Sequence, residues 1–290
     1  MSPSVHAAHY ADRAVQQTVS LLENVPLARH TYRARIRCPE IARAIVPGQF
    51  VMLRFSGASD PLLGRPLALY DTVVSAAGDA EGIDLVYVVR GKFTRLLANC
   101  GAGQRLDVWG PLGNGFPPLT TRHLILVAGG IGQTPFLALC KEALGHRRYG
   151  DLPRQASACA TVTLCYGVRS QEWIAGVDDF SPLGITVRLA TEDGSQGHRG
   201  LVTEVLEQVL RETELPRHVV ACGPEPMLRV VARLAAENHT PCLVSLETPM
   251  ACGIGICFSC VVRVRHPGGG WDYRRCCVDG PVFDAASIEW

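Results

Sequence analysis

Cysteines gather near the C-terminus of the chain, and their spacing constrains the fold more than any other feature of the sequence. Cys252, Cys257 and Cys260 follow the pattern C-x4-C-x2-C, and the adjacent pair Cys276 and Cys277 comes next. Two glycines inside the first loop permit the positive φ angles of a tight turn, so several thiolates can converge there. The pattern therefore predicts a loop that folds around a metal centre.

Three kinds of site use thiols in this way. A [2Fe–2S] cluster is favoured, because C-x4-C-x2-C with a later fourth cysteine is the plant-type spacing for such clusters. Structural zinc is an alternative, but it usually needs two C-x2-C knuckles and this stretch has one. Disulfides are disfavoured, since the N-terminus lacks the basic start and apolar block of a secretory signal. The other cysteines are expected to be buried, inert thiols: Cys38, Cys100, Cys140, Cys159, Cys165, Cys222 and Cys242.

The composition is that of a globular protein with sizeable cores. The 290 residues allow two domains and a small third unit, and 47% of them are hydrophobic. A formal net charge of +1 argues against a nucleic-acid partner or an anionic membrane surface. No apolar run approaches the roughly 20 residues of a membrane span. We therefore expect a cytoplasmic protein with no membrane span and no nucleic-acid partner.

Strand and helix patterns divide the chain into three parts. Residues 15–117 hold short β-branched and alternating runs broken by Gly, Pro and Asp, which predict an antiparallel β-barrel with one short helix at 94–100. Residues 118–240 alternate apolar strands with helices, which predicts a parallel α/β sheet. From residue 241 the regular pattern stops, so residues 241–290 are expected to form a small unit that holds the metal centre.

A glycine turn joins the first strand of the predicted parallel sheet to its first helix. In LILVAGGIGQTPF, the residues Gly129, Gly130 and Gly132 would let the backbone approach a pyrophosphate, and the helix N-terminus would supply free amides. The stretch is not a full G-x-G-x-x-G fingerprint, so a plain tight turn is the alternative. CGPEPM, residues 222–227, ends another predicted strand at the same edge of the sheet, where ligands of open α/β folds bind. Together the two turns favour a nucleotide site.

These two turns, in this order, resemble the nicotinamide-binding domain of the ferredoxin–NADP reductase superfamily. The resemblance implies a preceding flavin-binding barrel, which agrees with the strand-rich first part of the chain. RPLALYD resembles the flavin-binding strand of the superfamily, with Ala68 where Ser is usual. VYVVRGKFTRLL resembles its second flavin-contacting segment, with Phe93 where Gly is usual.

The resemblance assigns roles to individual residues. Arg65 would hold the flavin pyrophosphate, Tyr87 would pack on the flavin, and Thr94 would open a helix whose amides meet phosphate. The residues implied in binding FAD and NAD are Arg65, Pro66, Leu67, Ala68, Val86, Tyr87, Val88, Phe93, Thr94, Gly129, Gly130, Ile131, Gly132, Thr134, Pro135, Cys222, Gly223 and Pro224.

The C-terminal residues narrow the resemblance. SLETPMACGIGICFSCVVRV and the later CVDGPVF resemble the electron-transfer subunits of the B-type dihydroorotate dehydrogenases. That family implies three cofactors, namely FAD, NAD and a [2Fe–2S] cluster held by Cys252, Cys257, Cys260 and Cys277. The family places one cysteine two residues before Asp-Gly-Pro, which is Cys277. Cys276 is then expected to be a buried neighbour that points the other way along a strand.

The resemblance also implies a function and a partner. In that family a separate FMN-containing catalytic subunit oxidises dihydroorotate, and electrons pass from FMN through the cluster to FAD and then to NAD⁺. The two subunits are expected to form a heterotetramer of two copies each. No nucleophile and base stand out among the nine His residues, so no catalytic residue is assigned to this chain. The apolar residues Met250, Ile254, Ile256 and Phe258 are expected to face the partner.

Two other functions stay open. The chain could be a flavin/iron–sulfur subunit of an NADPH-linked ferredoxin reductase or a sulfhydrogenase, although some of those carry Asp where this chain has Cys252. Arg169 and Ser170 could bind the 2′-phosphate of NADP or form a plain polar turn. A scaffold or regulator without cofactors would agree with the departures at Ala68 and Phe93.

Overall fold

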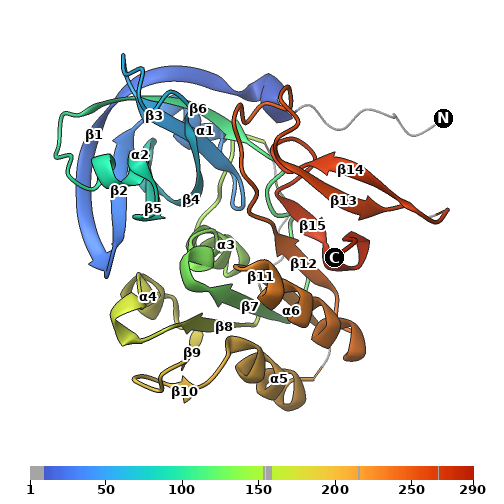
Figure 1. Cartoon of the computed structure of the whole chain (residues 1–290). Coiled ribbons are helices and arrows are strands. Elements are labelled where there is room, and N and C mark those ends of the chain that lie inside the picture. The colour runs from blue at the N-terminus through green and yellow to red at the C-terminus, as the bar shows by residue number, and fades with distance from the viewer. Residues whose placement is uncertain (1–9, 153, 155–158, 215, 267) are drawn as a thin grey trace.

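The first third of the chain forms a closed, antiparallel barrel of six strands (Figure 1). The computed structural model describes residues 10–152, 154, 159–214, 216–266 and 268–290. The barrel order is β1-β2-β5-β4-β3-β6, and fully buried side chains such as Leu53, Ile83 and Leu106 fill its interior. Its elements are η1 (Tyr10–Arg13), β1 (Val15–Ala28), β2 (Thr31–Arg37), α1 (Pro39–Ala44), β3 (Phe50–Phe55), β4 (Arg65–Val74), β5 (Ala80–Val88), α2 (Lys92–Leu97) and β6 (Arg105–Leu112).

Strand β1 is the barrel strand that neither the sequence patterns nor the resemblance predicted; β4 came from the resemblance alone. Its residues VQQTVSLLENVPLA include Gln, Glu, Asn and Pro, and irregularities in its pairing with β2 lie between Leu21 and Glu23 and between Pro26 and Ala28. These irregularities interrupt the alternation on which a strand prediction depends. Because β1 pairs with β2 along one side and with β6 along the other, this strand closes the barrel.

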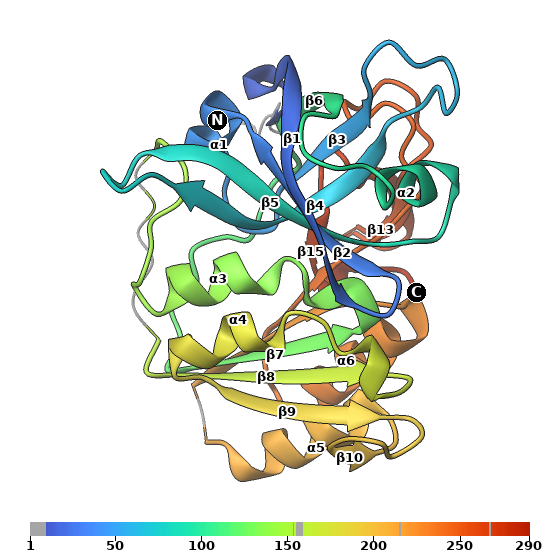
Figure 2. The same ribbon diagram turned by 90° about the vertical axis from the view of Figure 1, so that its left-hand side faces the viewer.

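The rest of the chain is built on a seven-stranded sheet in the order β10-β9-β8-β7-β11-β12-β15. All neighbours are parallel except β12 and β15. Figure 2 shows α3 and α4 between the sheet and the barrel, with α5 on the opposite face. The elements are β7 (His123–Gly129), η2 (Gly130–Gln133), α3 (Phe136–Ala143), β8 (Thr161–Val168), η3 (Gln171–Trp173), α4 (Val177–Phe180), η4 (Ser181–Leu183), β9 (Thr186–Thr191), β10 (His198–Arg199), α5 (Val202–Glu212), β11 (Arg217–Cys222), α6 (Glu225–Glu237), β12 (Cys242–Ser245), β15 (Val282–Asp284) and η5 (Ala285–Ser287).

A barrel followed by a mainly parallel α/β sheet confirms the predicted fold class. Among the described residues, no helix has both the length and the apolar character needed to cross a membrane.

The C-terminal part is less separate than residues 241–290 were expected to be. Its first strand, β12, and its last, β15, are members of the seven-stranded sheet. Only the cysteine loop and a two-stranded hairpin, β13 (Val261–Arg265) and β14 (Trp271–Arg275), stand outside it. A boundary at residue 241 therefore divides the sheet, because a four-residue strand such as β12 is too short to give a periodic signal.

A buried polar network fixes the barrel to the sheet domain. The carboxylate of Asp71, on β4, forms ion pairs with Lys141 of α3 and with Arg147, whose Nη1 lies 3.1 Å from Oδ1. Tyr149 donates its hydroxyl to the same carboxylate at 2.7 Å. Asp71 is itself buried, so its charge is neutralised by groups of the neighbouring domain and not by water. The network fixes the position of β4 against α3.

Candidate functional site

A cavity of about 390 Å³ lies where the barrel, the sheet and the segment after β12 meet. Its walls are mostly apolar, with Leu67 of β4 and Val86 of β5 among the barrel residues. Of the residues predicted to bind cofactors, the cavity is lined by Pro66, Leu67, Ala68, Val86, Tyr87, Val88, Thr94, Ile131, Thr134, Pro135 and Cys222. Segments far apart in the sequence, including the glycine turn, are thus brought to one hollow.

Two of the residues predicted to bind flavin, Arg65 and Phe93, do not line this cavity. Arg65 donates through Nη1 to the carbonyl oxygens of Leu63 and Gly64, both at 3.0 Å. Phe93 is fully buried and packs against Phe55, with ring centroids 5.1 Å apart, so its side chain belongs to the barrel core. Neither residue lines the cavity.

The glycines of the two turns allow the close approach of η2 and the end of β11. A Cβ atom on Gly132 would lie 2.1 Å from the carbonyl oxygen of Cys222, a distance that no side chain tolerates. Gly130 has φ +57°, which favours glycine by conformation alone. With Gly129, Gly223 and Pro224, these residues form the carboxyl edge of β7 and β11, as the sequence predicted.

Tyr87 and Thr94 are held by neighbouring groups. The Tyr87 hydroxyl donates to Oδ1 of Asn24 at 3.0 Å, and its ring stacks on Tyr32 with centroids 5.8 Å apart. Thr94 lies within α2 and does not open the helix; its Oγ1 accepts hydrogen bonds from the amides of Arg90 at 3.0 Å and Gly91 at 3.1 Å. Thr94 therefore shapes the turn that carries Arg90.

Arg90 and Glu247 are cavity residues that the sequence did not indicate. The side chain of Glu247 is accessible from the empty cavity, yet protein atoms surround it closely. The resulting desolvation raises the pKa of its carboxyl, and the positive charge of Arg90 opposes this in part. Burial also raises the pKa of the Cys222 thiol, with a further contribution from the negative charge of Glu247. No motif marks Glu247, because its surroundings come from separate parts of the chain.

Replacing Glu247 with Gln is expected to make the purified holoprotein more stable than the wild type at pH 8.5, with a smaller difference at pH 5.5. The pKa of the Glu247 carboxyl is higher in the folded state than its ordinary value of 4.5. At pH values above 4.5 the folded state therefore binds more protons than the unfolded state does. The stability of the wild type therefore falls as the pH rises through this range, whereas the amide does not titrate. Thermal unfolding at several pH values measures the difference. The control Glu81→Gln changes an exposed carboxyl outside the cavity. A stability difference between Glu247→Gln and the wild type that is the same at every pH would contradict the prediction.

The cysteine loop brings the thiols together in two pairs. Sγ of Cys260 lies 3.3 Å from Sγ of Cys277. Hydrogen bonds from Ser259, followed by one from Cys252, lower the pKa of Cys257 to about 6, and Sγ of Cys257 lies 3.1 Å from Oγ of Ser259. The hydrogen bond from Cys277 lowers the pKa of Cys260 in the same way. The loop therefore favours the thiolate, the form that binds metal, at Cys257 and Cys260.

Backbone amides also point at the sulfurs of this loop. The amide of Ile254 donates to Sγ of Cys252 at 3.4 Å, and the amide of Gly255 is directed at Sγ of Cys277, although the hydrogen bond with Cys260 and burial raise the pKa of the Cys277 thiol overall. Among the described residues, no group of three or more His, Cys, Asp or Glu side chains is placed to hold a single metal ion. Two sulfur pairs with amides directed at them fit a two-iron cluster better than one tetrahedral zinc ion.

Cys276 differs from these four cysteines because, among the described residues, its thiol forms no hydrogen bond with another thiol. Its side chain is fully buried, and burial raises the pKa of its thiol to about 12. Its amide donates to the carbonyl oxygen of Cys260 at 2.9 Å. The expectation that Cys276 and Cys277 alternate along a strand is wrong, because both lie in the turn that follows β14.

The edge of the sheet beyond β8 carries charges of both signs. Arg169 is exposed there, and Oγ of Ser170 lies 3.4 Å from the carboxylate of Glu172. Next to it, Ser195 donates its hydroxyl to Asp193 at 2.6 Å and accepts the amide of Gln171 at 2.8 Å. An arginine suits the 2′-phosphate of NADP and a fixed carboxylate suits the free ribose hydroxyls of NAD, so Arg169 alone does not indicate NADP.

Comparison with known protein families identifies two parts of the chain, both of which follow the barrel. Residues 247–289 match the family described as the iron–sulfur cluster binding domain of dihydroorotate dehydrogenase B. Residues 126–233 match the oxidoreductase NAD-binding domain. Both matches lie where the structure places the cysteine loop and the glycine turns.

Two solved structures share the fold. One, from work on flavin-based electron bifurcation by an NADH-dependent reduced ferredoxin–NADP oxidoreductase, superposes with a TM-score of 0.77 at 28% identity and covers 94% of this chain and 90% of that one. The ferredoxin NADP⁺ reductase of Neisseria gonorrhoeae, with bound FAD and NADP, has a TM-score of 0.61 at 18% identity and covers 77% and 91%. The second likeness concerns the fold alone.

Whole-length relatives decide between the members of this fold. The dihydroorotate dehydrogenase B (NAD(+)) electron transfer subunit of Desulforamulus reducens is 35% identical over 91% of this chain and 94% of its own length. The subunit of the same name from Geobacillus kaustophilus is 36% identical over 90% and 94%. The chain therefore belongs to the family of dihydroorotate dehydrogenase B electron transfer subunits.

Proposed function

We propose that this chain carries electrons from the FMN of a dihydroorotate dehydrogenase catalytic subunit to NAD⁺, in pyrimidine biosynthesis. The observation that supports this best is the continuity of the two sites, because residues 245–250 line the cavity and Cys252 follows on the same segment. Nε1 of Trp109, on β6, donates to the carbonyl oxygen of Cys252 at 3.0 Å. A Cβ on Gly253 would lie 2.6 Å from Cγ of Met52, so the loop rests directly on the barrel wall.

The cavity and the loop fit the cofactors of this family. A [2Fe–2S] cluster passes single electrons, FAD exchanges one or two, and NAD⁺ accepts two as hydride. In this chain Cys252, Cys257, Cys260 and Cys277 would hold the cluster. Residues 66–68 and 86–88 would enclose the flavin in apolar walls, with Arg90 as the nearby cation. The turns at 129–135 and 222–224 would bind NAD at the sheet edge.

Separating the two subunits tests the proposal. The chain purified alone, with FAD and cluster, is expected to reduce an artificial dye with NADH but not to convert dihydroorotate to orotate. Dihydroorotate-dependent reduction of NAD⁺ is expected only after the catalytic subunit is added. Orotate production by the chain alone would contradict this division of labour, and the catalytic subunit alone with NAD⁺ is the control.

The complex with the catalytic subunit has an expected location, stoichiometry and docking face. We place the complex in the cytoplasm, where thiols stay reduced and available to iron, and we propose two copies of each subunit. The docking face would include Ile254, Ile256 and Phe258, of which Ile256 is 73% and Phe258 62% exposed. Met250 was expected on this face, but it is partly buried against the core and lines the cavity.

The alternatives make different predictions for the same sample. A cofactor-free scaffold would be colourless, whereas the proposed carrier absorbs near 450 nm through its flavin and at longer wavelengths through its cluster. A subunit of an NADPH-linked reductase would turn over NADPH faster than NADH and would not respond to the dihydroorotate dehydrogenase subunit. The fully formed cavity argues against the scaffold, because Ala68 lines it and Phe93 does not obstruct it.

A further inference from the structure

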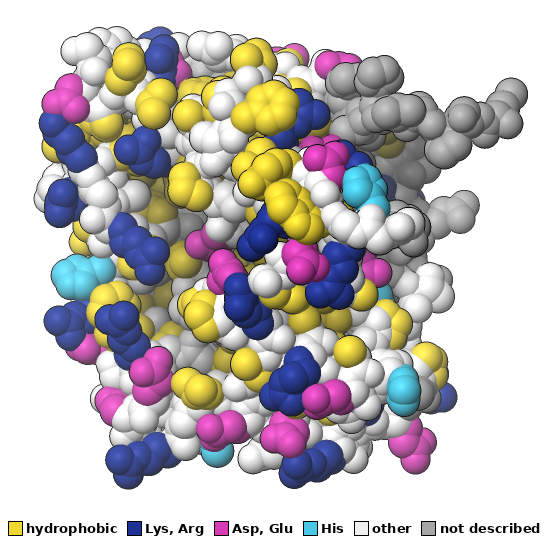
Figure 3. All heavy atoms as spheres, turned by 45° about the vertical axis from the view of Figure 1, so that its right-hand side comes forward, with side chains coloured by type: hydrophobic (Ala, Val, Ile, Leu, Met, Phe, Trp, Pro, Cys, Tyr) yellow, Lys and Arg dark blue, Asp and Glu magenta, His cyan; other side chains and the backbone are white. Residues whose placement is uncertain are grey.

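The β13–β14 hairpin has one covered face and one open face. Val262 and Val264, on the inner face, pack against the core of the sheet domain. On the outer face the ladder pairs Arg263 with Tyr273 and Arg265 with Trp271, and residues paired in this way share a face. Trp271 is 44% exposed and Tyr273 53%. Figure 3 shows hydrophobic side chains interleaved with basic ones where the hairpin lies.

The side chains of the outer face are ordered among themselves. The rings of Trp271 and Tyr273 meet edge to face with centroids 5.1 Å apart, and the guanidinium of Arg263 lies 5.3 Å from the Trp271 ring centre. Aromatic rings have few rotatable bonds, and Arg263 is already held against Trp271, so covering this face costs less ordering. Trp, Tyr and Arg are also the residues enriched among the hot spots of protein interfaces. A face of this composition has the properties of an interface hot spot.

The outer face is continuous with the cysteine loop. Arg275, at the end of β14, donates to the carbonyl oxygen of Gly255 at 2.9 Å and lies 5.2 Å from the ring centre of Phe258. Phe258 adjoins Cys257 and has φ +56°, a left-handed conformation that is unfavourable for a bulky residue. This conformation presents an aromatic ring to solvent beside the cluster ligands. Whatever covers the hairpin therefore also covers the loop.

The charge on this face indicates what covers it. Arg265 is paired with Glu289, and Arg275 with Asp279, while Arg263 forms no ion pair with any described residue. A second copy of this chain, docked by a two-fold axis, would place these arginines opposite one another. A partner with carboxylates at this position would pair with Arg263.

We propose that the outer face of the hairpin, with Phe258, is the hot spot that binds the dehydrogenase catalytic subunit, and that Arg263 pairs with a carboxylate of that subunit. The inference rests on the proposed function, because the electron donor must approach the cysteine loop. Beyond the proposed function, the inference names the hairpin as the main source of affinity for the catalytic subunit. It also assigns an acidic patch to the surface of that subunit.

Binding measured with the purified, FMN-loaded catalytic subunit tests this. Trp271→Ala and Tyr273→Ala are each expected to raise the Kd by about 30-fold or more, as hot-spot truncations do. Arg263→Glu is also expected to raise the Kd. The affinity of the wild type should increase at low salt, and this increase should be smaller in Arg263→Glu. The control Leu201→Ala removes a side chain that is 56% exposed near the start of α5, and it should bind like the wild type.

Each variant is first checked for its absorption spectrum and its NADH-dependent dye reduction. Both properties should be unchanged, because the hairpin lies outside the cavity. Wild-type Kd values in all three variants would overturn the inference while the proposed function stands. A wild-type chain that is fully loaded with cofactors but does not bind the catalytic subunit would overturn both. Dimers of the chain alone that dissociate on Trp271→Ala, seen by light scattering, would assign the face to a second copy instead.

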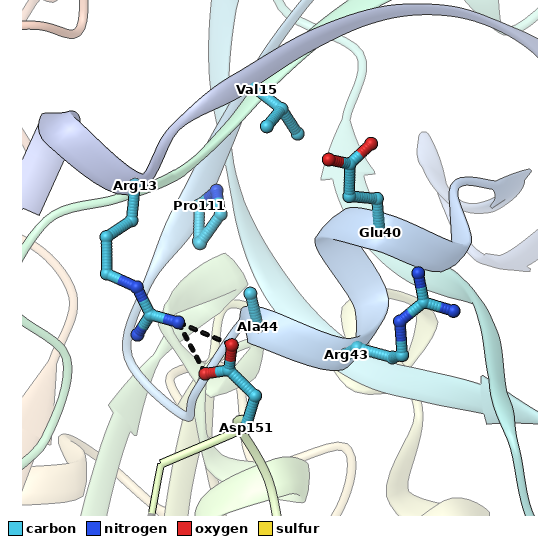
Figure 4. A pocket seen from close by; sticks show the side chains of 7 residues that line it. All are labelled: Arg13, Val15, Glu40, Arg43, Ala44, Pro111 and Asp151. Atoms are coloured by element: carbon cyan, nitrogen blue, oxygen red, sulfur yellow. Dashed lines mark hydrogen bonds and ion pairs between the residues drawn. The ribbon is translucent and has the colours of Figure 1, made fainter.

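Other surfaces were less informative. A polar hollow of about 290 Å³ between the N-terminal end of the barrel and α1 is shown in Figure 4. Arg13 and Asp151 pair with each other across it at 2.5 Å, so their charges are already satisfied. Nothing in this hollow points to a ligand.

Discussion

Replacing Cys277 with Ser is expected to abolish the iron–sulfur absorbance of the purified chain and to stop electron transfer from the catalytic subunit, whereas Cys276→Ser keeps both. Sγ of Cys277 lies 3.3 Å from Sγ of Cys260, inside the loop whose amides face the sulfurs. Among the described residues the Cys276 thiol forms no hydrogen bond with another cysteine; the pKa values of both thiols are raised, so the contact with Cys260, and not the pKa, distinguishes Cys277. A missing thiolate leaves one iron without a ligand, so the loss should be nearly complete. Iron content and visible absorbance measure it.

The flavin provides the internal control for this pair. FAD content and NADH-dependent dye reduction should persist in Cys277→Ser, because the flavin cavity does not include that residue. Since a buried hydroxyl can itself disturb the fold, Cys276→Ala and Cys277→Ala repeat the comparison without one. Cluster loss from the variants at 276, with retention in those at 277, would reverse the ligand assignment.

Asp71→Asn is expected to lower the free energy of unfolding by about 3–5 kcal/mol, the usual effect of removing one partner from a buried ion pair. The carboxylate neutralises Lys141 and Arg147 and accepts the hydroxyl of Tyr149, and all three groups come from the neighbouring domain. An amide leaves two half-buried cations without a counter-charge. Urea unfolding followed by circular dichroism measures the difference.

The matched control is Glu237→Gln on α6, which breaks the exposed pair with Arg233. An exposed pair of this kind contributes about 1 kcal/mol or less. Equal losses in the two variants would show that the Asp71 network is no stronger than a surface ion pair. A loss confined to Asp71→Asn would show that the junction of barrel and sheet depends on this carboxylate.

Sequence reasoning predicted the features that depend on local patterns. The glycine turn before α3 and the turn after β11 lie where their strands ended in the sequence, and C-x4-C-x2-C did predict a loop of converging thiols. The barrel was recognised from four of its short strands, although β1 was hidden by its polar residues and irregular pairing. These features succeeded because each is encoded within a short stretch.

The remaining features depend on distant segments meeting. Glu247 has no motif, and its raised pKa arises only because the barrel and the sheet enclose it. Phe93 was taken for a flavin contact from its place in a segment, yet the barrel closes over its ring. Cys277 was chosen over Cys276 from its place before Asp-Gly-Pro, and the expected alternation of the two along a strand is wrong because β14 ends at Arg275. Long-range packing decides all three, and a local pattern contains no information about it.

The way in which the C-terminal chain leaves and rejoins the sheet affects the order of assembly. The chain leaves the sheet at Ser245 and returns at Val282, and these two residues are partners in the pairing of β12 with β15. The cysteine loop and the hairpin are therefore an excursion whose two ends are joined by a ladder that contains no metal ligand. The sheet can therefore form without iron, and this topology allows an already folded apoprotein to receive its cluster afterwards.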